Sequence, residues 1–290
     1  MPVARRLHPA RPVAERSPRV RKIILGFATA ALLLPLVVQQ ASTQAAPPGQ
    51  ATIAAGRRAG PPTGPIPRLP DGTPDLGDGV WLGGGPVDDI EEAGGLKKGE
   101  LEALLLPSAR ALMATRDVTQ EPHNRCLPMG TPRVTPYPYR FVQNYTHRKP
   151  THMFILHEGN IHSYRQIFMD GRKHPADLDP TWYGHSIGSW EKDTLVIDTV
   201  GYNDKSWFDR RGFPHTEQMH TVERWTRLDK GRMEHRFTLD DPGAYTRPWT
   251  VTFMATLSPP TDDLMEYICQ ENNQYGVRTT PRAEKTIKPN

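Results

Sequence analysis

The segment 190-WEKDTLVIDTVGY-202 decides the fold. Its polar run Glu191–Thr194 fits a tight turn, and Leu195–Tyr202 then runs back with alternating side chains. Positions 195, 197 and 199 fall on one face, and positions 196, 198 and 200 fall on the other. A period of two in a stretch rich in β-branched residues predicts a β-strand, paired as a hairpin with the residues before the turn.

Asp198 is the unusual residue of this strand, because Val196 and Val200 flank it on its own face. If that face lines a cavity, the carboxylate needs hydrogen-bond partners or a raised pKa. If the face is solvated, Asp198 is an ordinary surface residue. The sequence leaves both interpretations open.

The same strand pattern recurs from Arg140 to Cys269, with turn residues between the segments. The predicted strands are Phe141–Tyr145, Thr151–His157, Ile161–Met169, His185–Trp190, Leu195–Tyr202, Thr221–Asp229, Arg232–Asp240, Trp249–Leu257 and Leu264–Cys269. Consecutive hairpins favour a mainly β fold, an antiparallel up-and-down barrel of lipocalin type, because closure removes exposed strand edges. A β-sandwich is the alternative. Small closed barrels hold one small ligand, so we expect a pocket.

One helical segment precedes the strands. Lys97–Arg116 carries leucines at helical spacing, with charged residues between them. Pro107 lies inside this pattern, which predicts a kink or two shorter helices.

The N-terminus has the three parts of a secretory signal. Arg5–Lys22 is basic, Ile23–Val38 is an apolar run of sixteen residues, and Thr43–Ala45 offers small residues for cleavage. The run is shorter than the roughly 18–20 residues of a spanning helix, so we expect no stable membrane anchor after cleavage. The predicted location is periplasmic or secreted. The predicted organisation is a signal peptide (1–45), a Pro/Gly-rich linker (46–76), one barrel domain (77–278) and a C-terminal tail (279–290).

The basic character of the chain belongs to this leader. Residues 1–45 carry seven Lys or Arg and one acid, a net charge of +6, against +4 for the whole chain, which leaves the mature protein near −2. No basic surface that would bind nucleic acid is therefore expected.

The two cysteines, Cys126 and Cys269, are expected to form one disulfide, because a single pair in an oxidising compartment usually does. A free buried thiol or a nucleophile is the alternative. Cys126 lies in RCLPMG, which carries no distinctive nucleophile signature.

The densest group of proton-transferring side chains lies at residues 214–224 (PHTEQMHTVER). Histidine titrates near neutral pH and a carboxylate can orient it, so the two together suit acid–base catalysis. The predicted catalytic residues are His215, Glu217, His220 and Asp198. A structural polar network is the competing interpretation.

Further polar or aromatic side chains on the predicted strands are candidates for substrate binding. They are His185, Arg165, Tyr164, His235 and Trp190. A guanidinium such as that of Arg165 can hold a carboxylate, although surface ion pairs with Asp177 and Asp179 would also explain the arginines of this region.

The sequence disfavours most cofactor chemistry. It has no Gly-x-Ser-x-Gly elbow and no nucleotide-binding fingerprint. A divalent metal such as Zn is a weak alternative, because His215, Glu217 and His220 could be ligands only if a loop gathered them. We therefore expect an enzyme without a cofactor.

Several motifs together resemble a family of exported bacterial hypothetical proteins. They are RCLPMGTPR, SIGSWEKDTLVIDTVGYND and HTEQMHTVERW, and the resemblance spans roughly residues 69–273. One departure is DLGDGVWLGGGP, where the family more often reads Asp-Leu-Ser-Gly-Val-Trp. The resemblance implies export and a single domain, and it carries over no catalytic residue.

The sequence thus predicts an exported β-barrel that binds a small, largely apolar molecule and acts on it as a hydrolase, lyase or isomerase. A periplasmic carrier without catalysis and a structural envelope protein are the alternatives.

Overall fold

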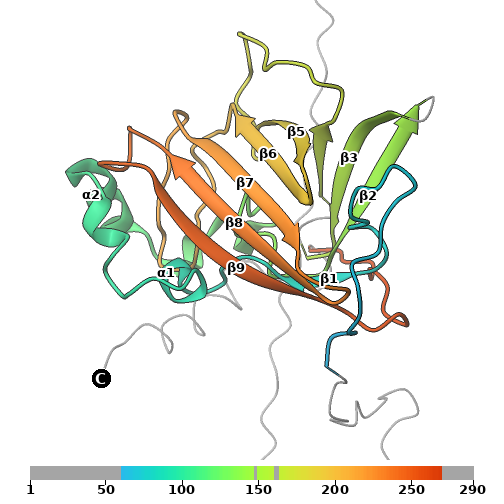
Figure 1. Cartoon of the computed structure of the whole chain (residues 1–290). Coiled ribbons are helices and arrows are strands. Elements are labelled where there is room, and N and C mark those ends of the chain that lie inside the picture. Colours follow the sequence, from blue (N-terminus) through green and yellow to red (C-terminus); the bar gives the residue numbers. More distant parts are fainter. Residues whose placement is uncertain (1–59, 147–148, 160–162, 270–290) are drawn as a thin grey trace, which may run out of the picture. The chain divides into compact units, whose positions relative to one another are not determined.

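The computed structural model describes residues 60–146, 149–159 and 163–269, which form a mainly β structure (Figure 1). Nine strands follow one another around a closed barrel, and β9 pairs with β1 to complete it. The strands are β1 Trp81–Gly83, β2 Tyr139–Thr146, β3 Lys149–His157, β4 Tyr164–Phe168, β5 His185–Glu191, β6 Thr194–Val200, β7 His220–Arg227, β8 Arg232–Asp240 and β9 Trp249–Leu257. The predicted β-barrel is confirmed.

One predicted strand is wrong, and one strand was not predicted. Residues 264–269 form no strand, whereas Trp81–Gly83 forms β1. The short β1 is the element that closes the barrel, since it lies between β2 and β9. Trp81 is fully buried there.

The barrel is mixed, not antiparallel throughout as predicted. β4 and β5 run parallel, with Ile167 opposite Ser186 and Phe168 opposite Ile187. The end of β4 therefore lies beside the start of β5, and residues 169–184 connect these two neighbouring points of the barrel wall. Its far end is fixed by two backbone hydrogen bonds, from Thr181 N–H to the Gly201 carbonyl and from Asn203 N–H to the Thr181 carbonyl. We call this connection the β4–β5 loop.

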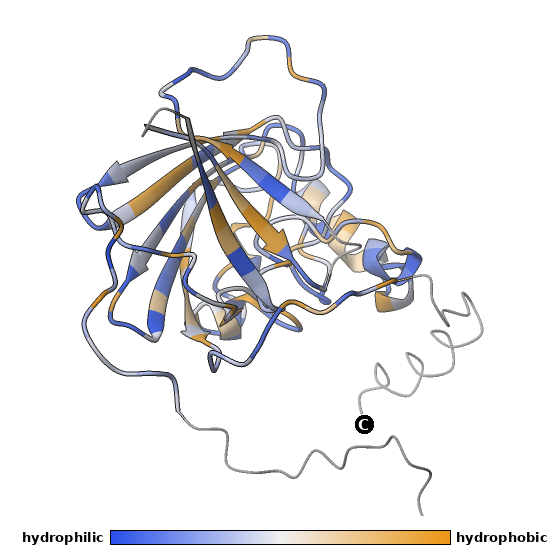
Figure 2. Ribbon diagram, turned by 90° about the vertical axis from the view of Figure 1, so that its right-hand side faces the viewer, coloured by the Kyte–Doolittle hydropathy of each residue, from blue (hydrophilic) through white to orange (hydrophobic). Residues whose placement is uncertain are grey.

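Alternation along the strands fills the barrel with side chains. In β6, Leu195, Ile197 and Thr199 are buried while their neighbours are half-buried, and β7, β8 and β9 alternate in the same way. Figure 2 shows the resulting hydrophobic and hydrophilic bands along the strands. Trp225 and Phe237 are among the large side chains buried completely.

The predicted helix divides at its proline. Glu102–Leu104 is a single 3₁₀ turn, and α2 begins at Pro107 and ends at Thr115. Proline is favoured in the first helical turn because its missing N–H has no partner there anyway. The remaining helical elements among the described residues are α1 Ile90–Ala93 and 3₁₀ turns at Val118–Gln120 and Pro122–Arg125.

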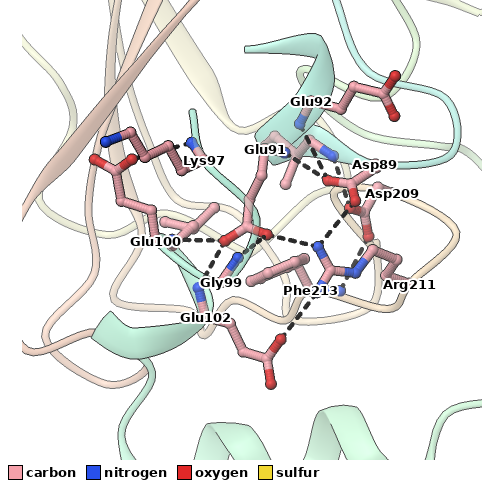
Figure 3. Close-up of polar contacts among 12 residues, drawn as sticks. Asp89, Glu91, Glu92, Lys97, Gly99, Glu100, Glu102, Asp209, Arg211 and Phe213 are labelled. Carbon is pink, nitrogen blue, oxygen red and sulfur yellow. Dashed lines mark hydrogen bonds and ion pairs between the residues drawn. The ribbon is translucent and has the colours of Figure 1, made fainter. Parts of the chain in front are cut away.

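A buried carboxylate ties the helical segments to the loop after β6 (Figure 3). Glu91 is fully buried and accepts backbone hydrogen bonds from Gly99, Leu101 and Glu102. Arg211 donates to Glu91 at 2.7 Å and to Asp89 at 3.0 Å. Each carboxylate oxygen of Glu91 and Asp89 accepts at least one hydrogen bond from within the protein, so the cluster organises the fold.

The predicted disulfide between Cys126 and Cys269 is present. Residues 60–76, the described part of the predicted linker, pack on the barrel: Arg68 makes a double hydrogen bond to Asp193, and Leu76 is buried. The predicted signal peptide, the rest of the linker and the C-terminal tail lie outside the described residues. Within the described part of the chain, no helix has the length and apolarity that a membrane crossing requires.

Candidate functional site

Asp198 lies on the outer face of the barrel wall between two histidines. His174 Nε2 is 2.9 Å from its Oδ1, and His220 Nε2 is 3.1 Å from both carboxylate oxygens. An ionised carboxylate only accepts hydrogen bonds, so both of these ring nitrogens carry a proton. When either ring is neutral, its Nδ1 therefore bears a free lone pair.

His185 extends this arrangement into a chain. Its Nδ1 lies 2.8 Å from Nδ1 of His174, and a contact of that length requires one donor and one acceptor. Because Asp198 fixes the proton of neutral His174 on Nε2, His174 accepts and His185 donates. The proton of His185 is thereby held on Nδ1, and its Nε2 is the basic atom at the end of the chain.

Strand register explains why these side chains meet. In the outward-facing rows, His185 is opposite Val200 and Asp198 is opposite both Ile187 and Val222. Asp198 is thus diagonal to His185 on one neighbouring strand and to His220 on the other, a spacing that long side chains bridge. His174 comes from the β4–β5 loop. The hydrogen bonds of Thr181 fix the far end of this loop, and His174 lies against the outward face beside Asp198. We call His174, His185, Asp198 and His220 the imidazole cluster.

Solvent reaches the imidazole cluster. The side chains of His174, Asp198 and His220 are 20%, 37% and 41% exposed. The rings of His185 and Phe168 are stacked, with 4.9 Å between their centroids. The guanidinium of Arg172 lies 3.8 Å from the centroid of the same Phe168 ring. Burial, aided by the nearby His174 and Arg172, lowers the pKa of His185. This lowering favours the neutral form of the His185 ring, in which Nε2 can accept a proton.

Two predicted binding residues lie inside the barrel instead. Arg165 Nη1 is 2.6 Å from Glu223 Oε1, and the other oxygen of Glu223 is 3.0 Å from His235 Nε2. The three side chains are at most 2% exposed. Burial alone would raise the pKa of Glu223, but the charge of Arg165 and the contact with His235 outweigh it and lower the pKa to about 2. This buried ion network is part of the packed interior.

The four predicted catalytic residues lie in different environments. Asp198 and His220 face outward, and Glu217 is exposed in the turn before β7. His215 is buried, with its Nε2 2.7 Å from Ser206 Oγ and its ring stacked on Phe208. Burial lowers the pKa of His215 to about 4. The structure thus joins His220 to Asp198 and shows no hydrogen bond from either to the two remaining candidates.

The aromatic candidates for substrate binding occupy two different environments. Tyr164 is 58% exposed and contacts Phe154 edge-to-face. Trp190 is half-buried and packs against the barrel core. Neither has a contact with the imidazole cluster among the interactions of the described residues.

The described residues contain no group of three or more His, Cys, Asp or Glu side chains arranged to hold a metal ion. The suggested zinc ligands His215, Glu217 and His220 are accordingly not gathered into one set.

Sequence reasoning did not select two residues that the structure makes central. Alternation could have identified Glu223, because Thr221, Glu223 and Trp225 share the inward face of β7. His174 carries no comparable signal, since its position depends on how the β4–β5 loop folds back. Comparisons with protein-family models, with curated proteins and with solved structures gave no match for this chain.

Proposed function

We propose that the protein is an acid–base enzyme that acts on a small molecule at the imidazole cluster, with Nε2 of His185 as the general base. The observation that carries the proposal is the chain of contacts from Asp198 through His174 to His185, which leaves a basic nitrogen in a fixed tautomer at a solvent-accessible position. A carboxylate that orients one imidazole and stabilises its cation is a recurrent catalytic device.

The proton balance of this chain is complete. His185 Nε2 takes a proton from a water molecule or from a carbon acid, and the ring becomes a cation. The proton on its Nδ1 then moves to Nδ1 of His174, so that the positive charge lies beside Asp198. The reverse sequence returns the proton to the product. Activated water corresponds to a hydrolase, and proton abstraction from carbon corresponds to a lyase or an isomerase.

The groups beside His185 indicate the kind of substrate. Phe168 contacts the rings of His185 and His152 and the guanidinium of Arg172, so it packs His185 in place. The side chain of Arg172 is 42% exposed, although it also bonds to Asp170. A substrate with an anionic group suits this exposed cation beside the base.

The proposed site of action is outside the cytoplasm. The disulfide between Cys126 and Cys269 is compatible with export, since such bonds persist in oxidising compartments. We place the mature protein in the periplasm or the medium, freed of its N-terminal signal.

Isotope incorporation tests the reaction without a known substrate. The full chain is incubated with a small-molecule extract of a bacterial culture, in ¹⁸O-labelled water and separately in D₂O, and mass gains are recorded by mass spectrometry. Hydrolysis incorporates oxygen, and proton abstraction from carbon exchanges deuterium. We expect at least one compound to gain label with the wild type and not with His185→Ala. No labelling, or equal labelling with both proteins, would contradict the proposal.

A further inference from the structure

The barrel wall is incompletely paired where β1 meets β2. The described residues give this pair a single register position, Trp81 opposite Tyr139, whereas β2 pairs with β3 over its whole length. Beyond Tyr139, residues 69–77 lie against the free edge of β2. Gly77 approaches so closely that a Cβ there would be 2.8 Å from the Phe141 carbonyl oxygen.

A pocket of about 270 Å³ lies at this seam. Its lining consists of Leu69, Asp75, Leu76, Gly77, Arg140, Phe141, Val142, Gln143 and Met153. This volume is just below the range of about 300–1,000 Å³ found for sites that bury drug-sized ligands. Leu76, Phe141 and Met153 belong to the barrel core, so one side of the seam pocket is apolar.

Two hydrogen-bond donors in the polar lining of the seam pocket have no partner within the described part of the chain. Arg140 Nε and Gln143 Nε2 are buried and have no hydrogen-bond partner among the described residues. A buried donor left without a partner destabilises the protein, so an acceptor from outside the chain is favoured. The carboxylate of Asp75, whose Oδ1 accepts from Gly77 N–H at 2.8 Å, is not a partner of either donor among the described residues.

The charge of the rim also favours an anion. Arg140 Nη2 lies 3.1 Å from Asp263 Oδ1, its ion-pair partner within the described part of the chain, and the Asp263 side chain is 81% exposed. An ion pair with so exposed a partner is weak and screened by salt. The guanidinium therefore retains most of its capacity to bind a carboxylate at the mouth of an apolar pocket.

We propose that the seam pocket binds a small amphipathic carboxylate, with its apolar body against Leu76, Phe141 and Met153 and its acid group on Arg140 and Gln143. This site shares no residue with the imidazole cluster and lies on different strands. The inference is therefore independent of the acid–base proposal.

Binding is tested with three probes that share one alkyl chain: octanoate, octan-1-ol and octylammonium. The full chain carries ¹³C-methyl methionine, and each probe is titrated while methyl spectra are recorded. We expect octanoate to saturate a single site and to shift the Met153 signal while Met254, exposed on β9, stays in place. Octylammonium should bind at least about tenfold more weakly.

Two variants separate recognition from folding. Gln143→Leu removes an unpaired buried donor, so its melting temperature should not fall while octanoate affinity drops at least about fivefold. Arg140→Leu should lower the affinity further, and the matched control Arg236→Leu, an exposed arginine on β8, should leave it unchanged. Equal binding of octanoate and octylammonium, no saturable binding, or affinity unchanged in both pocket variants would overturn the proposal.

Discussion

The Nδ1 atoms of His174 and His185 lie 2.8 Å apart, which makes the two rings a donor–acceptor pair. Asp198 decides the direction of that pair by holding the proton of His174 on its other nitrogen. The resulting chain gives His185 a defined tautomer and a route by which positive charge reaches a carboxylate. The predictions below follow from this chain and from the buried groups around it.

Asp198→Asn should abolish most of the isotope incorporation while leaving the fold intact. The asparagine side chain can donate as well as accept, so it no longer fixes the proton of His174 on Nε2 or stabilises the cation. We expect a loss of at least about 100-fold, the usual scale for disabling acid–base catalysis. The matched control is Asp177→Asn, which changes an exposed carboxylate of the β4–β5 loop. Equal losses in both variants would contradict a specific role for Asp198.

Arg172→Gln should move the acid limb of the pH–rate profile upward. A general base works in its neutral form, so activity is lost as pH falls through the pKa of His185. Because burial, His174 and Arg172 lower that pKa, activity should persist below pH 6.5 in the wild type. Removing the exposed charge of Arg172 should raise the midpoint, and the rise should be larger at low salt than at high salt. A downward shift would contradict the assignment.

Glu223→Gln should destabilise the barrel by about 3–5 kcal/mol, since it leaves the buried Arg165 without its counter-charge. Urea unfolding measures this. The control Glu191→Gln breaks an exposed pair with Arg224 and should change the unfolding free energy by about 1 kcal/mol or less. The pKa of Glu223 is lowered to about 2, so its contribution is complete above pH 4.5 and declines as pH falls toward 2. The variant should lack this decline.

Asp209→Asn should have the opposite pH dependence. Burial raises the pKa of Asp209 to about 6, although the carboxylate accepts backbone hydrogen bonds from Ile90 and Phe213. The folded state therefore binds this proton more tightly than the unfolded state, and the contribution of Asp209 falls as pH rises from about 4 to 6. Relative to wild type, Asp209→Asn should gain about 2–3 kcal/mol between pH 4 and 7. Asp88→Asn, a change at the exposed partner of Arg210, should show no such trend.

The barrel could be predicted from the sequence because its signal is local. Alternation and turn residues identify eight of the nine strands, and the hairpin at Glu191–Thr194 is as expected. β1 is too short to show a period, and the barrel closes through a contact between residues far apart in the chain. The parallel pairing of β4 with β5 is likewise a property of the whole barrel, since neither strand alone determines its neighbour's direction.

The candidate site was less predictable, because its residues come together only if particular faces of β5, β6 and β7 point out of the barrel. Period two places Asp198 and His185 on the outward rows only once the inside of the barrel is known. The spacing of His215, Glu217 and His220 suggested one group, yet the chain between them turns from the buried interior to the surface. His174 contacts Asp198 although the two residues lie 24 positions apart in the chain, and no pattern in the sequence encodes that contact.

The proposed chemistry requires that Asp198 and His174 hold the proton of neutral His185 on Nδ1 and leave its Nε2 basic. Long-range ¹⁵N–¹H correlation spectra of the histidine rings, recorded where the rings are neutral, report this tautomer directly. We predict the Nδ1–H form for His185 in the wild type and its loss in Asp198→Asn. The proton assignment would be contradicted if His185 had the Nε2–H form in the wild type. It would also be contradicted if the tautomer of His185 were the same in the wild type and in Asp198→Asn.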